Sequence, residues 1–453
     1  MSSPVAGSPP PAVAPWRWGV VWLLFLATML NYMDRLALNN TQRYLLPEFA
    51  PARADATALA AVGGPAAAAE ELELSRQRNR LYADVQFAFG VSFALFQVVA
   101  GFLIDRFSLR WLYFGAIVVW SAAGVLTGYV PAGAVGMLIA CRVALGVGEA
   151  FNWPCAVACI RRIIPRESRG LANGIFHSGA SIGAMATPFL VLLAIDTRTG
   201  TGWRTLFVVV GGVGAAWALL WVLCTRGGRA AAIDAVPPDE PTAGPVPFVS
   251  VFAMRGFWIC LGTGVFVNVC WHFYNQWFPR YLTEDLRVSA RDEQLVLAGF
   301  FIAADLGSML SGWTTRKLAR SGYSVERSRQ VVMTGLAAVV VAATVPAAYL
   351  PADRLAAKFG FFFVVASAAM GGFAIFFSLA QDIVPQHTAK ILGVCGCMSW
   401  LVISGVTQVA GRYAGPGKYA ELFVAVGCVP LGAAAVGWLW PRPAPLQTAS
   451  EVR

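Results

Sequence analysis

Charged side chains are scarce in this sequence of 453 residues, where Asp, Glu, Lys and Arg together make up 13%. A soluble domain carries roughly 25% of such residues. Hydrophobic residues make up 57% of the chain, and no polar stretch is long enough to form a separate soluble domain. This composition excludes a soluble globular protein and indicates that the function resides in membrane-embedded segments.

Histidine is rare, with 3 residues, and the 9 cysteines all lie in or beside apolar stretches. Cysteines in such places behave as small buried hydrophobic residues. The sequence therefore predicts no disulfide framework, no metal site and no cofactor. The net charge of +10 follows from the Lys and Arg that membrane proteins gather in cytoplasmic loops, so it gives no reason to expect a nucleic-acid partner.

Apolar runs long enough to cross a bilayer, about 20 residues each, form two sets of six. The first set lies near 18–38, 82–104, 111–130, 134–158, 170–194 and 203–224, and the second near 256–282, 294–315, 330–350, 358–380, 390–411 and 419–440. Five prolines between the two sets indicate an irregular linker. We therefore predict an all-α polytopic membrane protein whose 12 transmembrane helices form two six-helix bundles. The predicted parts are a disordered tail at 1–17, bundles at 18–224 and 253–440, a cytoplasmic linker at 225–252 and a second tail at 441–453.

Lys and Arg in the short loops set the orientation of the chain in the membrane. The loops after the fourth and eighth runs are rich in arginine, for example Arg161, Arg162 and Arg316, so we expect both loops in the cytoplasm. With an even number of spans, both termini then lie there too. The chain is expected to be a multi-pass protein of the cell membrane, the inner membrane in a bacterium. The polar segment 43–80 must then be an extracytoplasmic loop despite its arginines.

The two halves of the chain share a local repeat. Gly101-Phe-Leu-Ile-Asp-Arg-Phe-Ser-Leu-Arg110 follows the second span, and Gly312-Trp-Thr-Thr-Arg-Lys-Leu-Ala-Arg320 follows the eighth. Internal repeats of this kind are common in transporters. The glycines would let two helices approach closely, and Asp105 and Arg106 could pair with charges on neighbouring helices. A gate formed by Gly101, Asp105 and Arg106 and an ordinary positive-inside loop are equally good interpretations.

Few charges lie within the spans, and each needs a reason because a charged side chain at the bilayer centre costs about 2.5–3.5 kcal/mol. Asp34 and Arg35 lie in the first span, and Arg142 and Glu149 lie seven residues apart on one face of the fourth. All four could face one cavity. Burial favours the protonated form of an acid and a neighbouring arginine favours the ionised form. Asp34 and Glu149 are therefore candidate proton-coupling residues, and Arg35 offers a fork for a carboxylate. Structural salt bridges are the alternative.

The seventh span carries amide and aromatic groups at helical spacing: Asn268, Trp271, His272, Tyr274, Asn275, Gln276 and Trp277. Rings can stack on the C–H faces of a polyhydroxylated ligand and amides can bond its hydroxyls. Trp271, Tyr274 and Asn275 are therefore candidate substrate contacts, with an interfacial aromatic belt as the alternative near the end of the span. His177 in the fifth span is a further candidate, beside glycines and serines that favour close helix packing. Asp305 in the eighth span suits a packing or gating role.

Several of these segments also match known signatures. The segments Asn31–Arg35 and Arg142–Gly183 resemble those of the major facilitator superfamily of transporters, and more narrowly its anion:cation symporter family. Trp271–Leu282, Asp305–Ser308 and Gly322–Val325 resemble the hexuronate transporter branch of that family. The resemblance implies two pseudosymmetric halves around a central cavity, alternating access, and proton-driven uptake of an organic anion such as a sugar acid.

The resemblance also implies roles for single residues. Asp34 and Glu149 would couple protons, while Arg35 and Arg142 would contact the anionic substrate or the two acids. The remaining positions given to the substrate site are Tyr32, Gln97, His177, Trp271, Tyr274 and Asn275. Three positions depart from the hexuronate branch: Phe93, His177 and Ile375 stand where that branch tends to have Tyr, Asn and Asn.

We therefore expect a monomeric secondary active transporter that takes up a small organic anion, a hexuronate or related sugar acid, together with protons. Arg35 would bind the anion, and protonation of Asp34 and Glu149 would let the loaded carrier reorient. An enzyme is not expected, because no nucleophile–base pair or metal-ligand set stands out in the spans. An efflux carrier for organic anions or drugs, and a transporter-like ligand sensor, are the alternatives.

Overall fold

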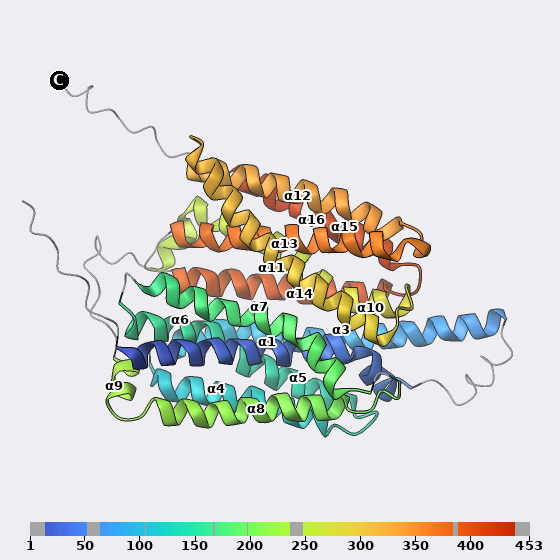
Figure 1. Cartoon of the computed structure of the whole chain (residues 1–453), viewed down its shortest axis with the longest axis horizontal. Coiled ribbons are helices and arrows are strands. Elements are labelled where there is room, and N and C mark those ends of the chain that lie inside the picture. The colour runs from blue at the N-terminus through green and yellow to red at the C-terminus, as the bar shows by residue number, and fades with distance from the viewer. Residues whose placement is uncertain are drawn as a thin grey trace, which may run out of the picture.

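Residues 14–51, 64–104, 106–165, 168–196, 198–235, 248–383 and 388–439 are described by the computed structural model, and they fold almost entirely as helices. Among them are 12 spans long and apolar enough to cross a membrane. Figure 1 shows two bundles lying side by side, one from each half of the chain. The predicted all-α fold with twelve spans in two six-helix bundles is confirmed.

Each bundle contains one span that is divided into two helices. The first bundle consists of α1 (Pro15–Phe49), α3 (Pro65–Leu103), α4 (Leu109–Gly128), α5 (Val135–Glu149), α6 (Asn152–Ile163), α7 (Arg169–Ala194) and α8 (Trp203–Cys224). The linker contributes α9 (Gly228–Asp234) and the 3-10 helix η2 (Phe248–Ala253). The second bundle consists of α10 (Arg255–Glu284), α11 (Ala290–Arg320), α12 (Val325–Tyr349), η3 (Ala352–Arg354), α13 (Leu355–Ile383), α14 (Thr388–Tyr413), α15 (Tyr419–Gly427) and α16 (Val429–Gly437).

Two helices of the first bundle extend well beyond the predicted apolar runs. α1 continues to Phe49 rather than to residue 38, and α3 begins at Pro65 rather than at residue 82. Much of the segment 43–80, expected as a loop, is therefore helical, with residues 52–63 outside the described part. Hydropathy marks where a helix leaves the bilayer and not where it ends. Ala, Glu and Arg are good helix formers, so the polar continuation stays helical.

The linker also contains regular structure next to the first bundle. Asp234 at the end of α9 accepts hydrogen bonds from the Ser108 hydroxyl at 2.7 Å and from the Arg110 backbone N–H at 3.2 Å. Asp234 thereby contributes a cap to the start of α4 and holds α9 against that helix. The expectations that fall on Asp105, on residues 236–247 and on the tails at 1–13 and 440–453 lie outside the described residues.

The break in the fourth span follows from the sequence. Pro154 has no N–H to donate to the carbonyl four residues earlier, so one helical hydrogen bond is lost there and a break in the helix is favoured. α5 ends at Glu149 and α6 begins at Asn152. The Asn152 side chain accepts from the Tyr113 hydroxyl at 2.7 Å and donates to the Thr28 hydroxyl at 3.1 Å. These bonds fix the break, and with it Glu149, inside the first bundle.

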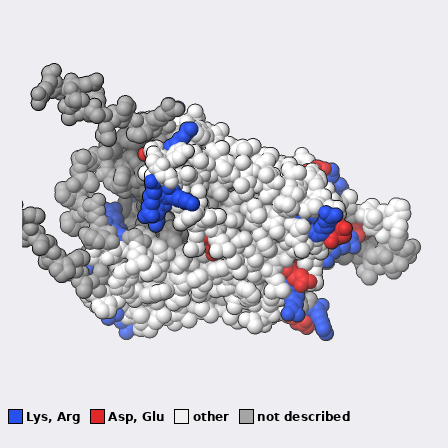
Figure 2. Space-filling view, turned by 45° about the horizontal axis from the view of Figure 1, so that its top comes forward, with Lys and Arg blue, Asp and Glu red and all other residues white. Residues whose placement is uncertain are grey.

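The surface has the pattern of a protein embedded in lipid. Figure 2 shows charged side chains gathered toward the two ends of one face, with a broad and almost uncharged band between them. Large hydrophobic side chains are exposed along the spans, for example Leu95, Leu193 and Met309. Such a band suits the hydrocarbon layer of a bilayer, so the chain is a multi-pass membrane protein.

Glycines contribute to packing at some of the expected places and not at others. Gly179 and Gly183 of α7 lie against the backbone of α1, where an added Cβ would overlap carbonyl oxygens. In contrast, a Cβ on Gly101 or Gly312 would meet no atom within 4 Å. The close helix approach expected at these two repeat glycines is therefore wrong, because open space surrounds them. Arg106 in the same repeat is exposed.

The cysteines lie mostly inside the bundles. Seven of the nine are buried, Cys224 is half-buried and Cys428 is exposed. Cys428 lies at the junction of α15 and α16, within the last span. Its thiol is therefore on the lipid-facing side of the second bundle.

Candidate functional site

A small cavity lies between the two bundles. The first bundle lines it through α1 and α3, and the second through α10 and α14. The lining residues are Tyr32, Arg35, Leu36, Asn39, Gln86 and Phe89, and from the second bundle Trp271, His272, Asn275, Gln276 and Trp400. Four of the predicted substrate contacts are among them: Tyr32, Arg35, Trp271 and Asn275.

Arg35 is the one Lys or Arg among the lining residues, and it is bound to a buried acid. Its Nε donates to Glu149 Oε2 at 2.9 Å, and its Nη2 lies 2.8 Å from the same oxygen. Glu149 is fully buried, at 0% exposure. Aromatic rings surround the guanidinium, with centroids 4.6 Å (Phe93), 5.2 Å (Tyr32) and 5.5 Å (Trp400) from Cζ. These rings stabilise the cation through their π faces.

Asp34 and Arg142 lie deeper in the first bundle and do not line the cavity. Each is 1% exposed. Asp34 interacts electrostatically with Glu149 and Arg142, and Arg142 interacts with Glu149 and Arg35. Neither oxygen of Asp34 finds a hydrogen-bond partner among the described residues. The two acids and two guanidiniums form one buried cluster whose formal charges cancel.

Amides from both bundles bond to one another beside the cavity. Asn39 Nδ2 donates to Asn275 Oδ1 at 3.0 Å. The Oδ1 of Asn39 accepts from Gln86 Nε2 at 2.5 Å and from the Tyr82 hydroxyl at 3.1 Å. Tyr82 is also within 2.8 Å of the Gln276 backbone carbonyl. This amide layer joins the bundles and separates the cavity from the ends of α1 and α10 at Phe49 and Glu284.

Several lining residues were not predicted, although a signal for them exists in the sequence. Asn39 and Gln86 are polar side chains inside or next to apolar runs. His272 and Gln276 belong to the polar stretch of the seventh span. Trp400 in α14 carries no such signal, because a tryptophan in an apolar run looks like ordinary core or lipid-facing surface.

Tyr274 does not reach the cavity. Its hydroxyl is 2.9 Å from the Thr344 hydroxyl and donates to the Phe423 backbone carbonyl at 3.0 Å. Both partners belong to the second bundle, and Tyr274 is buried. The geometry therefore gives Tyr274 a packing role inside that bundle.

Gln97 and His177 also lie away from the cavity lining, at contacts between the bundles. A Cβ on Gly396 of α14 would lie 2.7 Å from Gln97 Oε1. The His177 ring lies among aromatic rings, with its centroid 4.5 Å from that of Trp153 and 6.0 Å from that of Phe377 in α13. Both side chains therefore take part in the seam between the halves.

Asp305 lies at another part of this seam. The Ser181 hydroxyl of α7 donates to Asp305 Oδ1 of α11 at 2.7 Å. This bond crosses from one bundle to the other and connects two helices that pack along their length. Within the described ranges, no group of three or more His, Cys, Asp or Glu side chains is arranged to hold a metal ion.

Two helical bundles with a cavity between them are an architecture found in many secondary transporters. The family model of the Major Facilitator Superfamily matches residues 24–408. The chain therefore belongs to this superfamily and is a transporter rather than an enzyme.

Three relatives of the chain are named as transporters of organic acids. The D-galactonate transporter of Escherichia coli is 26% identical over 344 residues, which cover 71% of this chain and 72% of the relative. The hexuronate transporter of Escherichia coli is 24% identical over 442 residues, 93% of each chain. The probable sulfoacetate transporter of Cupriavidus necator is 26% identical over 394 residues, 81% of this chain and 87% of the relative. The resemblance to sugar-acid transporters is confirmed.

Solved structures share the fold. A bacterial homologue of the human lysosomal transporter Spinster, inward-facing and occupied, has a TM-score of 0.70 at 19% identity and covers 94% of this chain and 97% of that chain. The D-xylose-proton symporter has a TM-score of 0.67 at 15% identity, with 93% and 97% covered.

Proposed function

We propose that this transporter carries a small organic anion, a hexuronate or related sugar acid, into the cell together with protons. The observation that carries the proposal is Arg35, whose guanidinium lines the central cavity and is held by the buried carboxylate of Glu149. Galactonate, hexuronate and sulfoacetate, for which the relatives are named, are all small organic anions. Their shared chemistry supports the substrate class.

Glu149 and the substrate would compete for the same guanidinium. The ionised Glu149 carboxylate accepts a hydrogen bond from Arg35 Nε and lies against Nη2 through the same oxygen, on the side of the guanidinium that a substrate carboxylate would use. A proton on Glu149 removes the negative charge from this competitor and frees Arg35. Proton and anion therefore favour each other's binding, which is the thermodynamic requirement for coupled transport.

Charge balance also favours the binding of a proton together with the anion. The cluster of Asp34, Arg35, Arg142 and Glu149 is formally neutral, so an anion at Arg35 adds one negative charge to a buried site. An uncompensated charge in such surroundings is costly, and a proton taken up by Glu149 or Asp34 cancels it. A monoanion that enters a negative-inside cell works against about 2.3 kcal/mol per 100 mV. Two protons would turn that voltage into a driving force, and two acids are present.

The amide layer offers partners for the hydroxyls of a sugar acid. Asn39 and Asn275 come from different bundles and bond to each other at 3.0 Å. Hydroxyl groups of a bound substrate would exchange with this bond and so loosen one contact between the halves. Substrate would thereby have a different affinity for the two states of the carrier, as alternating access requires. Reorientation then takes place between the bundles at 18–224 and 253–440.

The orientation of the chain is part of the proposal. The arginine-rich loops support a cytoplasmic location for both termini, with the inner membrane as the membrane in a bacterium. The opposite end of the molecule, where α1 reaches Phe49 and α10 reaches Glu284, then faces outward. We refer to this end as the distal end.

The decisive experiment measures anion binding to the purified protein with and without Arg35. Thermal-shift and calorimetric titrations against hexuronates, aldonates and aldarates should show binding to the wild type and none to Arg35→Ala. Because this variant leaves Glu149 without its partner, the double variant Arg35→Ala/Glu149→Gln serves beside it. The exposed Arg412 of α14 gives a matched control, and Arg412→Ala should bind as the wild type does. Unchanged binding by a folded Arg35→Ala would reject the proposal.

Vesicle transport distinguishes uptake from efflux and from a sensor. With protein reconstituted in liposomes, an inward proton gradient should drive accumulation of the bound carboxylate, and counterflow should occur without a gradient. A carrier dedicated to export would accumulate substrate against the opposite gradient. A sensor would bind the ligand and show no counterflow.

A further inference from the structure

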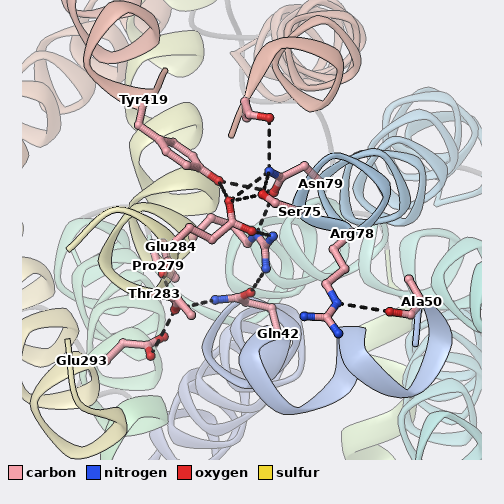
Figure 3. Close-up of polar contacts among 12 residues, drawn as sticks. Gln42, Ala50, Ser75, Arg78, Asn79, Pro279, Thr283, Glu284, Glu293 and Tyr419 are labelled. Carbon is pink, nitrogen blue, oxygen red and sulfur yellow. Dashed lines mark hydrogen bonds and ion pairs between the residues drawn. The ribbon is translucent and has the colours of Figure 1, made fainter. Parts of the chain in front are cut away.

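A second layer of polar contacts closes the distal end, beyond the amide layer that borders the cavity (Figure 3). Its centre is Arg280 of α10, which is 3% exposed. Arg280 Nε donates to Asn79 Oδ1 at 2.8 Å and Nη1 donates to Gln42 Oε1 at 2.7 Å. Arg280 also forms an ion pair with Glu284, one turn further along the same helix. We call this layer the distal seal.

The carboxylate of Glu284 completes the arrangement. It accepts hydrogen bonds from the Tyr419 hydroxyl at 2.6 Å, from Asn79 Nδ2 at 3.0 Å and from the Ser75 hydroxyl at 3.0 Å. Arg280 and Glu284 thus neutralise each other within α10. The hydrogen-bond partners that the first bundle supplies to them are neutral, and Arg78 of α3 interacts with both through its charge. If the bundles part here, water replaces these amides and hydroxyls and the ion pair stays intact.

A different contact in the distal seal joins opposite charges from the two bundles. Arg43 Nη1 of α1 lies 3.2 Å from Glu293 Oε2 of α11, and Glu293 is 1% exposed. Thr283 donates to the same oxygen at 3.3 Å, whereas Oε1 finds no hydrogen-bond partner among the described residues. Arg287 and Glu71 also pair between the bundles, but both are exposed, and such pairs contribute little.

We propose that the Glu293 carboxyl is a proton-binding site within the distal seal, and that its protonation loosens the contact between the bundles at this end. The ionised form attracts Arg43 across the seam. The neutral form no longer does, and Arg43, which also donates to the Val288 carbonyl at 2.7 Å, is left without a counter-charge there. Separation of the bundles then allows water to solvate the guanidinium.

The charged and titratable groups around Glu293 support this direction. Arg43 and Tyr44 face it from α1, and Arg280 faces it from α10. Glu284 forms its ion pair with Arg280. Asp196, beyond the end of α7, faces Tyr44. Glu293 therefore lies between two guanidiniums from different bundles, and its protonation leaves their mutual repulsion uncompensated.

Another acid at the same end provides a contrast. Asp285 follows α10 and accepts the Gly417 backbone N–H at 2.8 Å, and burial raises the pKa of its carboxyl. Both residues belong to the second bundle. Protonation of Asp285 therefore does not change a contact between the halves, and Asp285→Asn is the matched control.

The inference rests on the proposed function for its physiological meaning: acid outside the cell would open the outward-facing side where the co-transported proton is abundant. Its test needs neither substrate nor transport. Amide hydrogen exchange would be measured by mass spectrometry on the full chain in lipid nanodiscs. The segments compared are the ends of α1 and α10, from Asn40 to Phe49 and from Pro279 to Asp285, with rates corrected for the intrinsic effect of pH.

In the wild type, lowering the pH from about 8 to about 5, across the range of a perturbed carboxyl, should raise the corrected exchange of both segments at least about threefold. Glu293→Gln should exchange rapidly at both pH values, because it carries no charge to attract Arg43. Asp285→Asn should respond as the wild type does. The proposal fails if the wild type shows no rise, or if Glu293→Gln retains the full response. Should Glu293→Gln not fold, the wild-type measurement alone decides.

This outcome is independent of the proposed function. Loss of anion binding in Arg35→Ala tests the cavity and requires no change at the distal end. A pH-dependent seal in a protein that binds no carboxylate would leave the present inference standing and remove the proposed substrate class.

Discussion

The side chain of Asp34 lies directly against Gly124 of α4, where an added Cβ would be 3.0 Å from Asp34 Oδ1. Arg35, the next residue, turns toward the central cavity. Successive residues of an α-helix point about 100° apart, so two neighbouring charges on α1 face different surroundings. Asp34 is enclosed in the first bundle, whereas Glu149 contacts the arginine that lines the cavity. The two acids are therefore expected to differ in how they affect transport.

Glu149→Gln should tighten anion binding near neutral pH. The variant removes the carboxylate that competes for Arg35, so the dissociation constant should fall by about tenfold, equivalent to about 1.4 kcal/mol. In the wild type, binding should tighten as the pH falls, because protonation of Glu149 frees the guanidinium. Calorimetric titrations at several pH values check both statements. A wild-type affinity that is independent of pH, or a variant that keeps the wild-type pH dependence, contradicts the competition mechanism.

Asp34→Asn should separate binding from coupling. Asp34 does not line the cavity, and the variant imitates its protonated form, which leaves the buried cluster with one net positive charge, so anion affinity should equal or exceed that of the wild type. Counterflow in liposomes should persist, whereas accumulation driven by a pH gradient should be lost, because one acid of the buried cluster no longer takes up a proton. Loss of binding in this variant would instead assign Asp34 to the substrate site.

Gly179→Ala should destabilise the first bundle. The added Cβ would overlap the backbone of α1, and overpacking of this kind costs about 1–3 kcal/mol. Gly174 on the same helix has no atom within 4 Å of its Cβ position, so Gly174→Ala should be neutral or stabilise the helix by up to about 1 kcal/mol. Thermal unfolding of both variants in detergent provides the comparison, and equal melting temperatures would contradict it.

Ser181→Ala tests whether the bond to Asp305 acts as a gate. A hydrogen bond of this kind contributes about 0.5–1.5 kcal/mol. If it must break in each transport cycle, the variant should raise the counterflow rate by roughly threefold to tenfold. Ser178 of the same helix bonds to the backbone of its own helix at 2.8 Å, so Ser178→Ala should leave the rate unchanged. A lower melting temperature at an unchanged rate would assign the Ser181–Asp305 bond to packing.

Hydropathy was sufficient to predict the fold, and its failures have a common cause. The position of each span depends on a long apolar run, which single residues hardly disturb. The ends of α1 at Phe49 and of α3 at Pro65 were missed because a helix that leaves the bilayer keeps its backbone hydrogen bonds in water. The glycine at position 101 was given a packing role because sequence shows a small residue and not whether a neighbour is present.

The site residues that could be predicted are those whose type is rare within a transmembrane span. Arg35 and Glu149 stand out because a charge inside a span is costly, and the structure brings these two side chains together. Tyr274 and Asn275 look equally suitable in the sequence, yet only Asn275 lines the cavity. The direction in which a helix faces depends on its neighbours, and a polar side chain such as Tyr274 can find its partner inside its own bundle.

The distal seal gave no signal in the sequence. Arg280 and Glu293 lie near the expected ends of their spans, at 282 and 294, where charged residues are common and are normally hydrated. Only the packing of the two bundles shows that both side chains are buried. Gln42, Ser75 and Asn79 lie outside the expected apolar runs, where polar residues are common, so the sequence did not mark them either.

The distribution of thiols makes the chain suitable for site-specific chemistry. Seven cysteines are enclosed, Cys428 lies on the lipid-facing side of the last span, and the half-buried Cys224 ends α8. Once Cys224 is replaced, a water-soluble maleimide is expected to react slowly with the remaining thiols, and a cysteine introduced in an aqueous region should be labelled selectively. Glu71 and Arg287, an exposed pair at the distal end, offer one such position on each bundle. A donor and an acceptor dye attached there would follow the distance between the two halves in the working transporter.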